Sequence, residues 1–160
     1  FGIIAAHKYD LDKIVRIQAY RDAIVKGGGE LPAEAFITGC SGASGGEEGM
    51  RRLLTLTNRP TAVLTTHDPI AAGAIRYARQ VGLNVPGDIS IAGYSDTDMA
   101  SLLDPPLTTV THNSFEHGRL AVETLCEMMD KTHAGESVSP TDIVCHREAV
   151  FRASTGPAPK

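Results

Sequence analysis

The sequence has no run of apolar residues long enough to cross a membrane. Its opening, Phe1 to Ala6, is apolar, but the polar stretch His7-Lys8-Tyr9-Asp10 follows at once, whereas a spanning helix needs about 20 apolar residues. No basic leader precedes the opening, as it would in a secretory signal peptide. We interpret this segment as a β-strand. Because the chain also lacks an initiating Met, we expect it to be the later part of a longer protein.

Positive charge is not in excess. The chain has 15 Lys and Arg residues against 19 Asp and Glu residues, which gives a net charge of −4. Surfaces that bind nucleic acid are usually basic, because they neutralise phosphates. We therefore expect these 160 residues not to bind DNA by themselves.

Cysteine and histidine patterns typical of metal sites are missing. The three cysteines, Cys40, Cys126 and Cys145, are far apart and form no Cys-x-x-Cys pair, which favours free thiols in a reducing cytoplasm. The six histidines contain no i, i+4 pair and no companion cysteine motif. Neither of the glycine-rich nucleotide-binding fingerprints is present. We expect no metal and no cofactor.

What the chain does have is a regular alternation of apolar strands and amphipathic helices. Hydrophobic residues make up 42% and charged residues 21%, as in a soluble globular domain. Expected strands cover residues 1–6, 36–38, 61–65, 88–92 and 142–146, with a further one near 149–151. Expected helices cover residues 13–26, 44–56, 68–81 and a long segment after Asn113. This alternation predicts an α/β fold with a parallel sheet and helices on both faces.

Several polar residues have positions that suggest helix caps or turns. Asp10 or Asp12 can cap the first helix, and Asp68 before Pro69 can cap the third. Capping boxes are predicted at Ser44-Gly45-Gly46-Glu47 and at Asn113-Ser114-Phe115-Glu116. Asp96 can fix the turn after Tyr94 by accepting from backbone amides.

The polar cluster Tyr94-Ser95-Asp96 follows the strand that ends before Gly93. Small ligands bind at the carboxyl ends of the strands in open α/β sheets. This edge of the sheet is therefore the first candidate for a binding site.

A catalytic alternative comes from the glycine-rich segment. Gly42-Ala43-Ser44-Gly45-Gly46 fits the Gly-x-Ser-x-Gly elbow of serine hydrolases, and Asp96 with His112 could nominally complete a triad. The capping box explains Ser44 without catalysis, and we favour it. A serine-directed fluorophosphonate that labels Ser44 would revive the hydrolase.

Four stretches that follow one another in order cover nearly the whole chain: Arg16 to Ala23, Pro60 to Ala74, Val85 to Val110, and the Phe151-Arg152-Ala153-Ser154-Thr155 ending. Together they resemble the effector-binding domain of the LacI/GalR family of bacterial transcription regulators, a fold shared with periplasmic sugar-binding proteins. The first stretch is similar to the family's Arg-x-x-Gly-aromatic helix, with Ala19 in place of the glycine.

The resemblance implies a two-lobed domain of which this chain is part. Residues 1–111 would form the C-terminal lobe, residues 112–140 would belong to the N-terminal lobe, and residues 141–155 would return to the C-terminal one. Residues 156–160 would be a disordered tail.

By the same resemblance, the chain is part of a cytoplasmic transcriptional repressor that senses a small polar effector, a sugar or a nucleoside-like metabolite. It would act as a homodimer and contact operator DNA only through an N-terminal headpiece absent from this sequence. It would not be an enzyme. The alternative is a periplasmic sugar-binding protein of a transporter, which free thiols disfavour.

The resemblance also nominates site residues. The predicted effector contacts are Arg16, His67, Ser95, Cys40 and Ser114. The family usually has Asn at His67 and Asp at Ser95, and often has aromatics at Cys40 and Ser114, so we expect an altered and roomier pocket. The alternatives are a solvated helix arginine for Arg16 and a capping or packing histidine for His67.

A dimer face is nominated in the same way. It comprises Ile70, Ala72, Met99, Leu102 and Leu103. The alternative is that these residues belong to the ordinary hydrophobic core.

Overall fold

A computed structural model describes residues 1–6, 11–139 and 142–159, and the side chains of α1 from Val15 onward. The chain divides into two compact units. The larger consists of Phe1–Thr111 and Ala149–Lys160, and the smaller of His112–Glu148. The assignment of these parts to the two lobes of a domain stays a prediction. The predicted caps Asp10 and Asp12 lie outside the described side chains.

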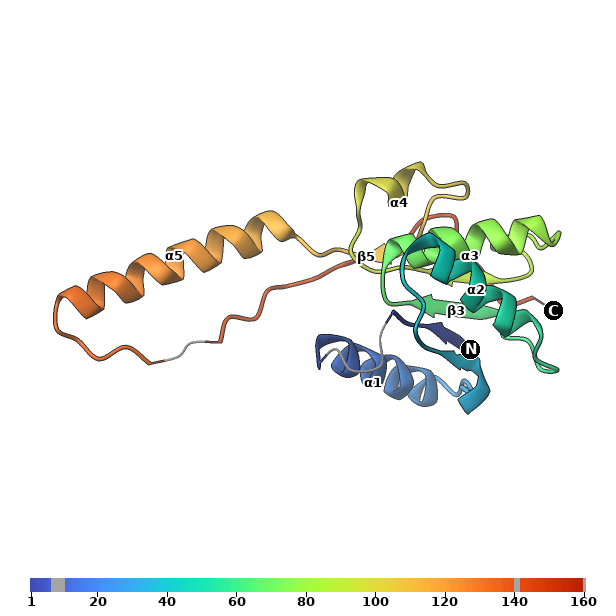
Figure 1. Cartoon of the computed structure of the whole chain (residues 1–160), viewed down its shortest axis with the longest axis horizontal. Helices are drawn as coiled ribbons and strands as arrows, with labels where there is room; N and C mark the ends of the chain where they lie inside the picture. The colour runs from blue at the N-terminus through green and yellow to red at the C-terminus, as the bar shows by residue number, and fades with distance from the viewer. Residues whose placement is uncertain (7–10, 140–141, 160) are drawn as a thin grey trace. The chain divides into compact units, whose positions relative to one another are not determined.

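Four short strands form the sheet of the larger unit (Figure 1). They are β1 (Gly2–Ile4), β2 (Phe36–Ile37), β3 (Ala62–Thr65) and β4 (Ser90–Ala92), in the order β2-β1-β3-β4. Every neighbouring pair is parallel, because a helical connection returns the chain to the same end of the sheet each time. The predicted α/β class with a parallel sheet is confirmed.

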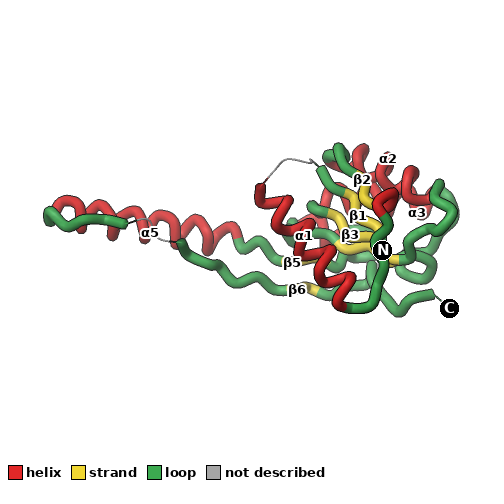
Figure 2. Tube along the Cα trace, turned by 90° about the horizontal axis from the view of Figure 1, so that it is seen from below, coloured by secondary structure: helices red, strands yellow, loops and turns green. Residues whose placement is uncertain are grey.

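Helices cover both faces of this sheet (Figure 2). The elements are α1 (Leu11–Lys26), the 3-10 turn η1 (Ala33–Ala35), α2 (Gly42–Leu54), α3 (Asp68–Gln80) and the short α4 (Asp98–Leu102). On one face, Ile17 of α1 packs with Ile3. On the other, Met50 of α2 and Ile70 of α3 belong to one cluster with Ile4. Adjacent residues of one strand, Ile3 and Ile4, are both fully buried, as expected for a sheet covered on both sides.

Glycines let α2 and α3 approach each other closely. A Cβ added to Gly73 would lie 1.8 Å from the carbonyl oxygen of Ala43, and one added to Gly46 would lie 2.0 Å from that of Ile70. The glycine-rich segment thus has a packing role. The capping box predicted at Ser44 is wrong, because α2 begins at Gly42 after Ser41, which places Ser44 in the first helical turn and not at a strand-to-helix elbow.

Two further strands pair at the boundary of the larger unit. β5 (Thr109–Val110) and β6 (Ala149–Val150) are antiparallel. Single bridges also join Ala92 to Thr108 and Ser95 to Thr111 in parallel. These two strands lie at the points where the chain passes from the larger unit to the smaller and back.

Of the two strands predicted near the end of the chain, the one at 142–146 is wrong, whereas the further one near 149–151 is confirmed as β6. Residues 142–146 form no strand, and Val144 is 94% exposed. A β-branched run forms a strand only if it finds a partner, and in the described residues the partner of β5 is Ala149–Val150 instead. The tail also departs from its prediction at Gly156, whose amide donates to the Ser90 hydroxyl at 3.1 Å.

The smaller unit contains one long helix, α5 (Ser114–His133). The Asn113 carboxamide accepts from the Glu116 amide at 3.3 Å, so the cap predicted at Asn113 is confirmed. None of the residues of α5 is buried. One side of the helix, including His117 and Leu125, lines a groove of about 760 Å³ together with residues 143–145 and Arg147 of the same unit.

Candidate functional site

Polar side chains gather at the carboxyl edge of the sheet. Thr66 and His67 follow β3, while Tyr94 and Ser95 follow β4, which is its neighbour in the sheet. The side chain of Arg16 reaches the same edge from α1. Three elements that are distant in the sequence therefore supply one cluster, at the edge where α/β sheets bind ligands.

The guanidinium of Arg16 is held at this edge by two neighbours. Its Nη1 donates to the carbonyl oxygen of Thr66 at 2.9 Å, and its Cζ lies 3.4 Å from the centre of the Tyr94 ring. A cation stacked on an aromatic face gains electrostatic attraction. The side chain is partly buried, so the solvated arginine that the sequence left as an alternative is not what the structure shows. That Arg16 contacts an effector stays a prediction.

Tyr20 is a residue of this region that the sequence did not single out as a site residue. Its hydroxyl donates to the carbonyl oxygen of Thr65 at 3.5 Å. Burial raises the pKa of the Tyr20 phenol to about 12, while the positive charge of Arg16 lowers it in part and Asp68 raises it. Tyr20 therefore remains a neutral hydrogen-bond donor. Its position four residues after Arg16, one helical turn on, is the signal that could have found it.

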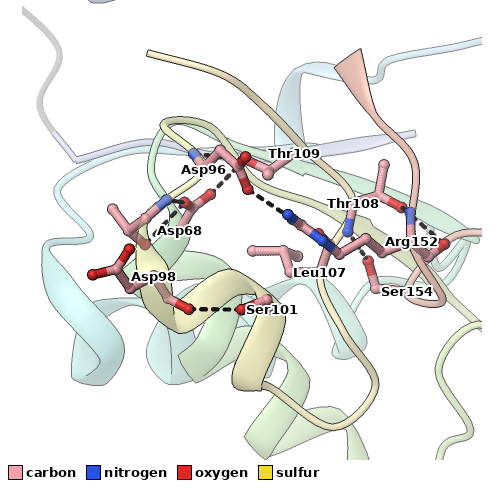
Figure 3. Close-up of polar contacts among 10 residues, drawn as sticks. Asp68, Asp96, Asp98, Ser101, Leu107, Thr108, Thr109, Arg152 and Ser154 are labelled. Atoms are coloured by element: carbon pink, nitrogen blue, oxygen red, sulfur yellow. Dashed lines mark hydrogen bonds and ion pairs between the residues drawn. The ribbon is translucent and has the colours of Figure 1, made fainter. Parts of the chain in front are cut away.

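Asp68 is fully buried beneath the edge. Its Oδ2 accepts from the amide and the hydroxyl of Thr97 at 2.8 and 3.1 Å, and its Oδ1 accepts from the hydroxyl of Thr109 at 2.7 Å (Figure 3). The predicted capping role is wrong, because the cap position of α3 is His67 and Asp68 is the first helical residue. The carboxylate instead joins the segment after β4 to strand β5.

Asp96 also differs from its prediction. Its Oδ1 forms an ion pair with Nη1 of Arg152 at 2.7 Å (Figure 3), rather than binding backbone amides of its own turn. Tertiary contacts hold the turn: the Ser95 amide donates to the carbonyl oxygen of Val110 at 2.9 Å, and the Asp96 amide donates to the Thr109 hydroxyl at 3.4 Å. The spacing of residues in the sequence gave no signal for these partners.

The other predicted effector contacts lie in different places. His67 and Ser95 are both half-buried at the edge, each next in sequence to a residue that contacts Arg16. Cys40 follows β2 but is only 3% exposed, and burial raises the pKa of its thiol. Ser114 belongs to the smaller unit, at the exposed first residue of α5. The structure thus brings Arg16, His67 and Ser95 to one edge, and leaves Cys40 little surface.

The nominated dimer face is also divided. Ile70 is 1% exposed and belongs to the core, which is the alternative that the sequence left open. Leu102 is 83% exposed. Ala72 and Leu103 line a groove of about 540 Å³ beside Arg76 and other α3 residues, while Met99 is half-buried in α4.

The described residues contain neither a candidate metal cluster nor a candidate membrane-spanning helix. Among them, no group of three or more His, Cys, Asp or Glu residues could hold a metal ion. Within the same ranges, no helix is long and apolar enough to pass through a bilayer.

Comparison with known proteins gives matches along almost the whole chain. A ribose operon repressor of Haemophilus influenzae is 40% identical over 139 residues, which cover 85% of this chain and 41% of that protein. This chain thus spans about two fifths of the length of that repressor.

Solved structures of transcriptional regulators are also similar to this chain over almost its whole length. A LacI family transcriptional regulator from Bifidobacterium animalis subsp. lactis is 29% identical with a TM-score of 0.83, covering 98% of this chain and 55% of that one. The complex of the transcriptional regulator CelR with cellobiose is 27% identical with a TM-score of 0.84, covering 96% of this chain and 46% of that one. The family of periplasmic binding protein-like domains matches residues 1–155, and the chain belongs to this family.

Proposed function

We propose that this chain is part of the effector-binding domain of a DNA-binding transcriptional repressor of the LacI/GalR type. The observation that carries the proposal is the cluster of Arg16, Thr66 and Tyr94 at the carboxyl edge of the sheet. It occurs in a chain that is similar over most of its length to a ribose operon repressor.

The effector is a small polar molecule, a sugar or a nucleoside-like metabolite. The planar guanidinium of Arg16 can donate two parallel hydrogen bonds to a pair of oxygens. The Ser95 hydroxyl can donate or accept, and the His67 ring can do either according to its protonation. The similarity to a ribose operon repressor and to a regulator bound to cellobiose supports a sugar, and D-ribose is the first to test.

The mechanism is a change of hinge angle and not a chemical reaction. The effector binds between the two lobes and favours one angle, and a homodimer transmits it to headpieces that lie outside these residues. Coupling of this kind typically amounts to about 1–3 kcal/mol. Leu102, Ala72 and Leu103 belong to the proposed dimer face, and the protein acts in the cytoplasm.

The second candidate is a periplasmic sugar-binding protein of the same fold. The similarity to repressors disfavours it. The coding sequence upstream of Phe1 discriminates between the two, because a helix-turn-helix supports the regulator and a cleavable signal peptide supports the transporter component.

A ligand screen tests the proposed function directly. The full-length protein is heated with D-ribose, cellobiose and a panel of other sugars and nucleosides. We expect at least one to raise the melting temperature, since a ligand at 100 times its Kd stabilises the folded state by about 2.7 kcal/mol. The same ligand should change the affinity for DNA from the gene's own promoter. If no compound does either, the proposed function is wrong.

A further inference from the structure

The loop Tyr94–Thr97 after β4, here called the edge loop, has an unusual backbone. Ser95 and Asp96 have φ angles of +121° and +49°. Residues other than glycine rarely adopt these positive φ angles, because their Cβ atom then comes too close to a neighbouring carbonyl oxygen. Such a conformation persists only when surrounding contacts impose it.

The contacts that impose this backbone conformation come from β5, from the segment after β6 and from Asp68, which accepts from the Thr97 amide at the end of the loop. β5 accepts from the amides of Ser95 and Asp96, through the Val110 carbonyl oxygen and the Thr109 hydroxyl. The segment after β6 contributes Arg152, whose Nη1 lies 2.7 Å from Oδ1 of Asp96.

Arg152 is itself fixed to the chain that precedes β5. Its Nη1 donates to the carbonyl oxygen of Leu107 at 2.9 Å, and its amide donates to the Thr108 hydroxyl at 2.9 Å. The side chains of Arg152 and Asp96 are only 21% and 23% exposed, whereas those of the surface pair Arg79 and Asp104 are 51% and 83% exposed. Partial burial strengthens an ion pair relative to one in open solvent.

We propose that Arg152 is a positioning residue which, through Asp96, fastens the edge loop to both strands that connect the two units. This rests on the proposed function, in which Ser95 contacts the effector. A ligand that moves Ser95 must then also move β5 and the segment after β6, which lead into and out of the smaller unit. The loop thus joins ligand contact to the connecting strands by direct hydrogen bonds and one ion pair.

Amide hydrogen exchange on the full-length protein without ligand tests the proposal. In Arg152→Gln and in Asp96→Asn, we expect exchange at the Ser95 and Asp96 amides, and at the Arg152 amide, to become at least about tenfold faster, because opening of the loop becomes easier. Amides of β1 and β3 should keep their wild-type rates. Arg152→Lys should restore part of the protection, and the double variant should exchange no faster than the worse single one.

Arg79→Gln is the matched control, because it breaks a pair in the same unit that does not touch the loop. Unchanged exchange at Ser95 in both loop variants would overturn the proposal. Uniformly faster exchange across the sheet would also overturn it, since it would mark a merely structural role. In a second arm the wild type is measured with D-ribose at about 10 mM, above the usual range of substrate affinities. If ribose protects no amide, ribose is not the effector, while the ligand-free arm still decides the role of Arg152.

Discussion

At the scale of single residues, Asp68 and Asp96 mark the limit of sequence reasoning. The pair Asp68-Pro69 correctly predicts where a helix begins. It does not predict a buried carboxylate, because the partners Thr97 and Thr109 are 29 and 41 residues away. Cap and turn rules describe local contacts, so they assign local roles to residues that the fold uses for distant ones.

Replacing the buried carboxylate tests the role of Asp68. Asp68→Asn keeps the shape of the side chain but replaces one of its two accepting oxygens with an NH2 group. That group then faces a donor of Thr97 or Thr109, so we expect the free energy of unfolding to fall by about 1–3 kcal/mol. Urea unfolding measures it. Asp98→Asn, at the exposed first residue of α4, is the control and should change stability little. Equal effects of the two substitutions would contradict the assigned role.

Tyr20 predicts an alkaline loss of stability. The folded state holds the phenol pKa at about 12, above its ordinary value of about 10, so the unfolded chain gives up this proton at lower pH. The stability that the protonated Tyr20 phenol contributes is therefore fully present below about pH 10 and is lost as the pH rises from about 10 through about 12. Unfolding free energies are measured from about pH 9 to about pH 11.5, which covers the start of this loss. They should fall less steeply with rising pH in Tyr20→Phe than in the wild type. Parallel pH profiles would show that the phenol titrates normally.

At the scale of elements, the sequence was reliable where periodicity and helix-breaking residues agree. It placed the helices near 13–26 and 68–81, and the four parallel strands, close to their observed bounds. It failed where glycine has a tertiary role: the start of α2 was set at Ser44, although Gly42 already belongs to the helix. The strand predicted at 142–146 is also wrong, because an apolar run by itself does not show whether a neighbouring strand is there to pair with it.

The close contact of α2 and α3 makes a sharp prediction. In Gly73→Ala the new Cβ meets the Ala43 carbonyl oxygen, and we expect a loss of about 1–3 kcal/mol or more, as in other overpacked sites. Gly118→Ala, in α5, meets no atom within 4 Å and should stabilise its helix by up to about 1 kcal/mol. Thermal and urea unfolding compare the two. A Gly73→Ala protein as stable as wild type would contradict the packing described for these helices.

At the scale of the whole molecule, four motifs in order were enough to give the family and the parallel fold. The site could be predicted only in part. The rule that α/β sheets bind ligands at their carboxyl edge selects the segment that contains Ser95, whereas Arg16 and His67 are nominated by the family resemblance. Arg152, in contrast, is brought to the edge loop by the pairing of β5 with β6 and by the hydrogen bonds of Ser154 to Ile91 and Thr108, and these contacts depend on the complete topology.

The most direct test of the central claim is a calorimetric titration of the full-length protein with D-ribose, or with the sugar or nucleoside that the thermal screen identifies. Arg16→Ala is compared with Arg21→Ala, which removes an arginine of the same helix that stacks on Phe36 instead. We predict that Arg16→Ala weakens binding about tenfold or more, a loss of at least about 1.4 kcal/mol, while Arg21→Ala binds as wild type does. Undiminished affinity in Arg16→Ala would contradict the account.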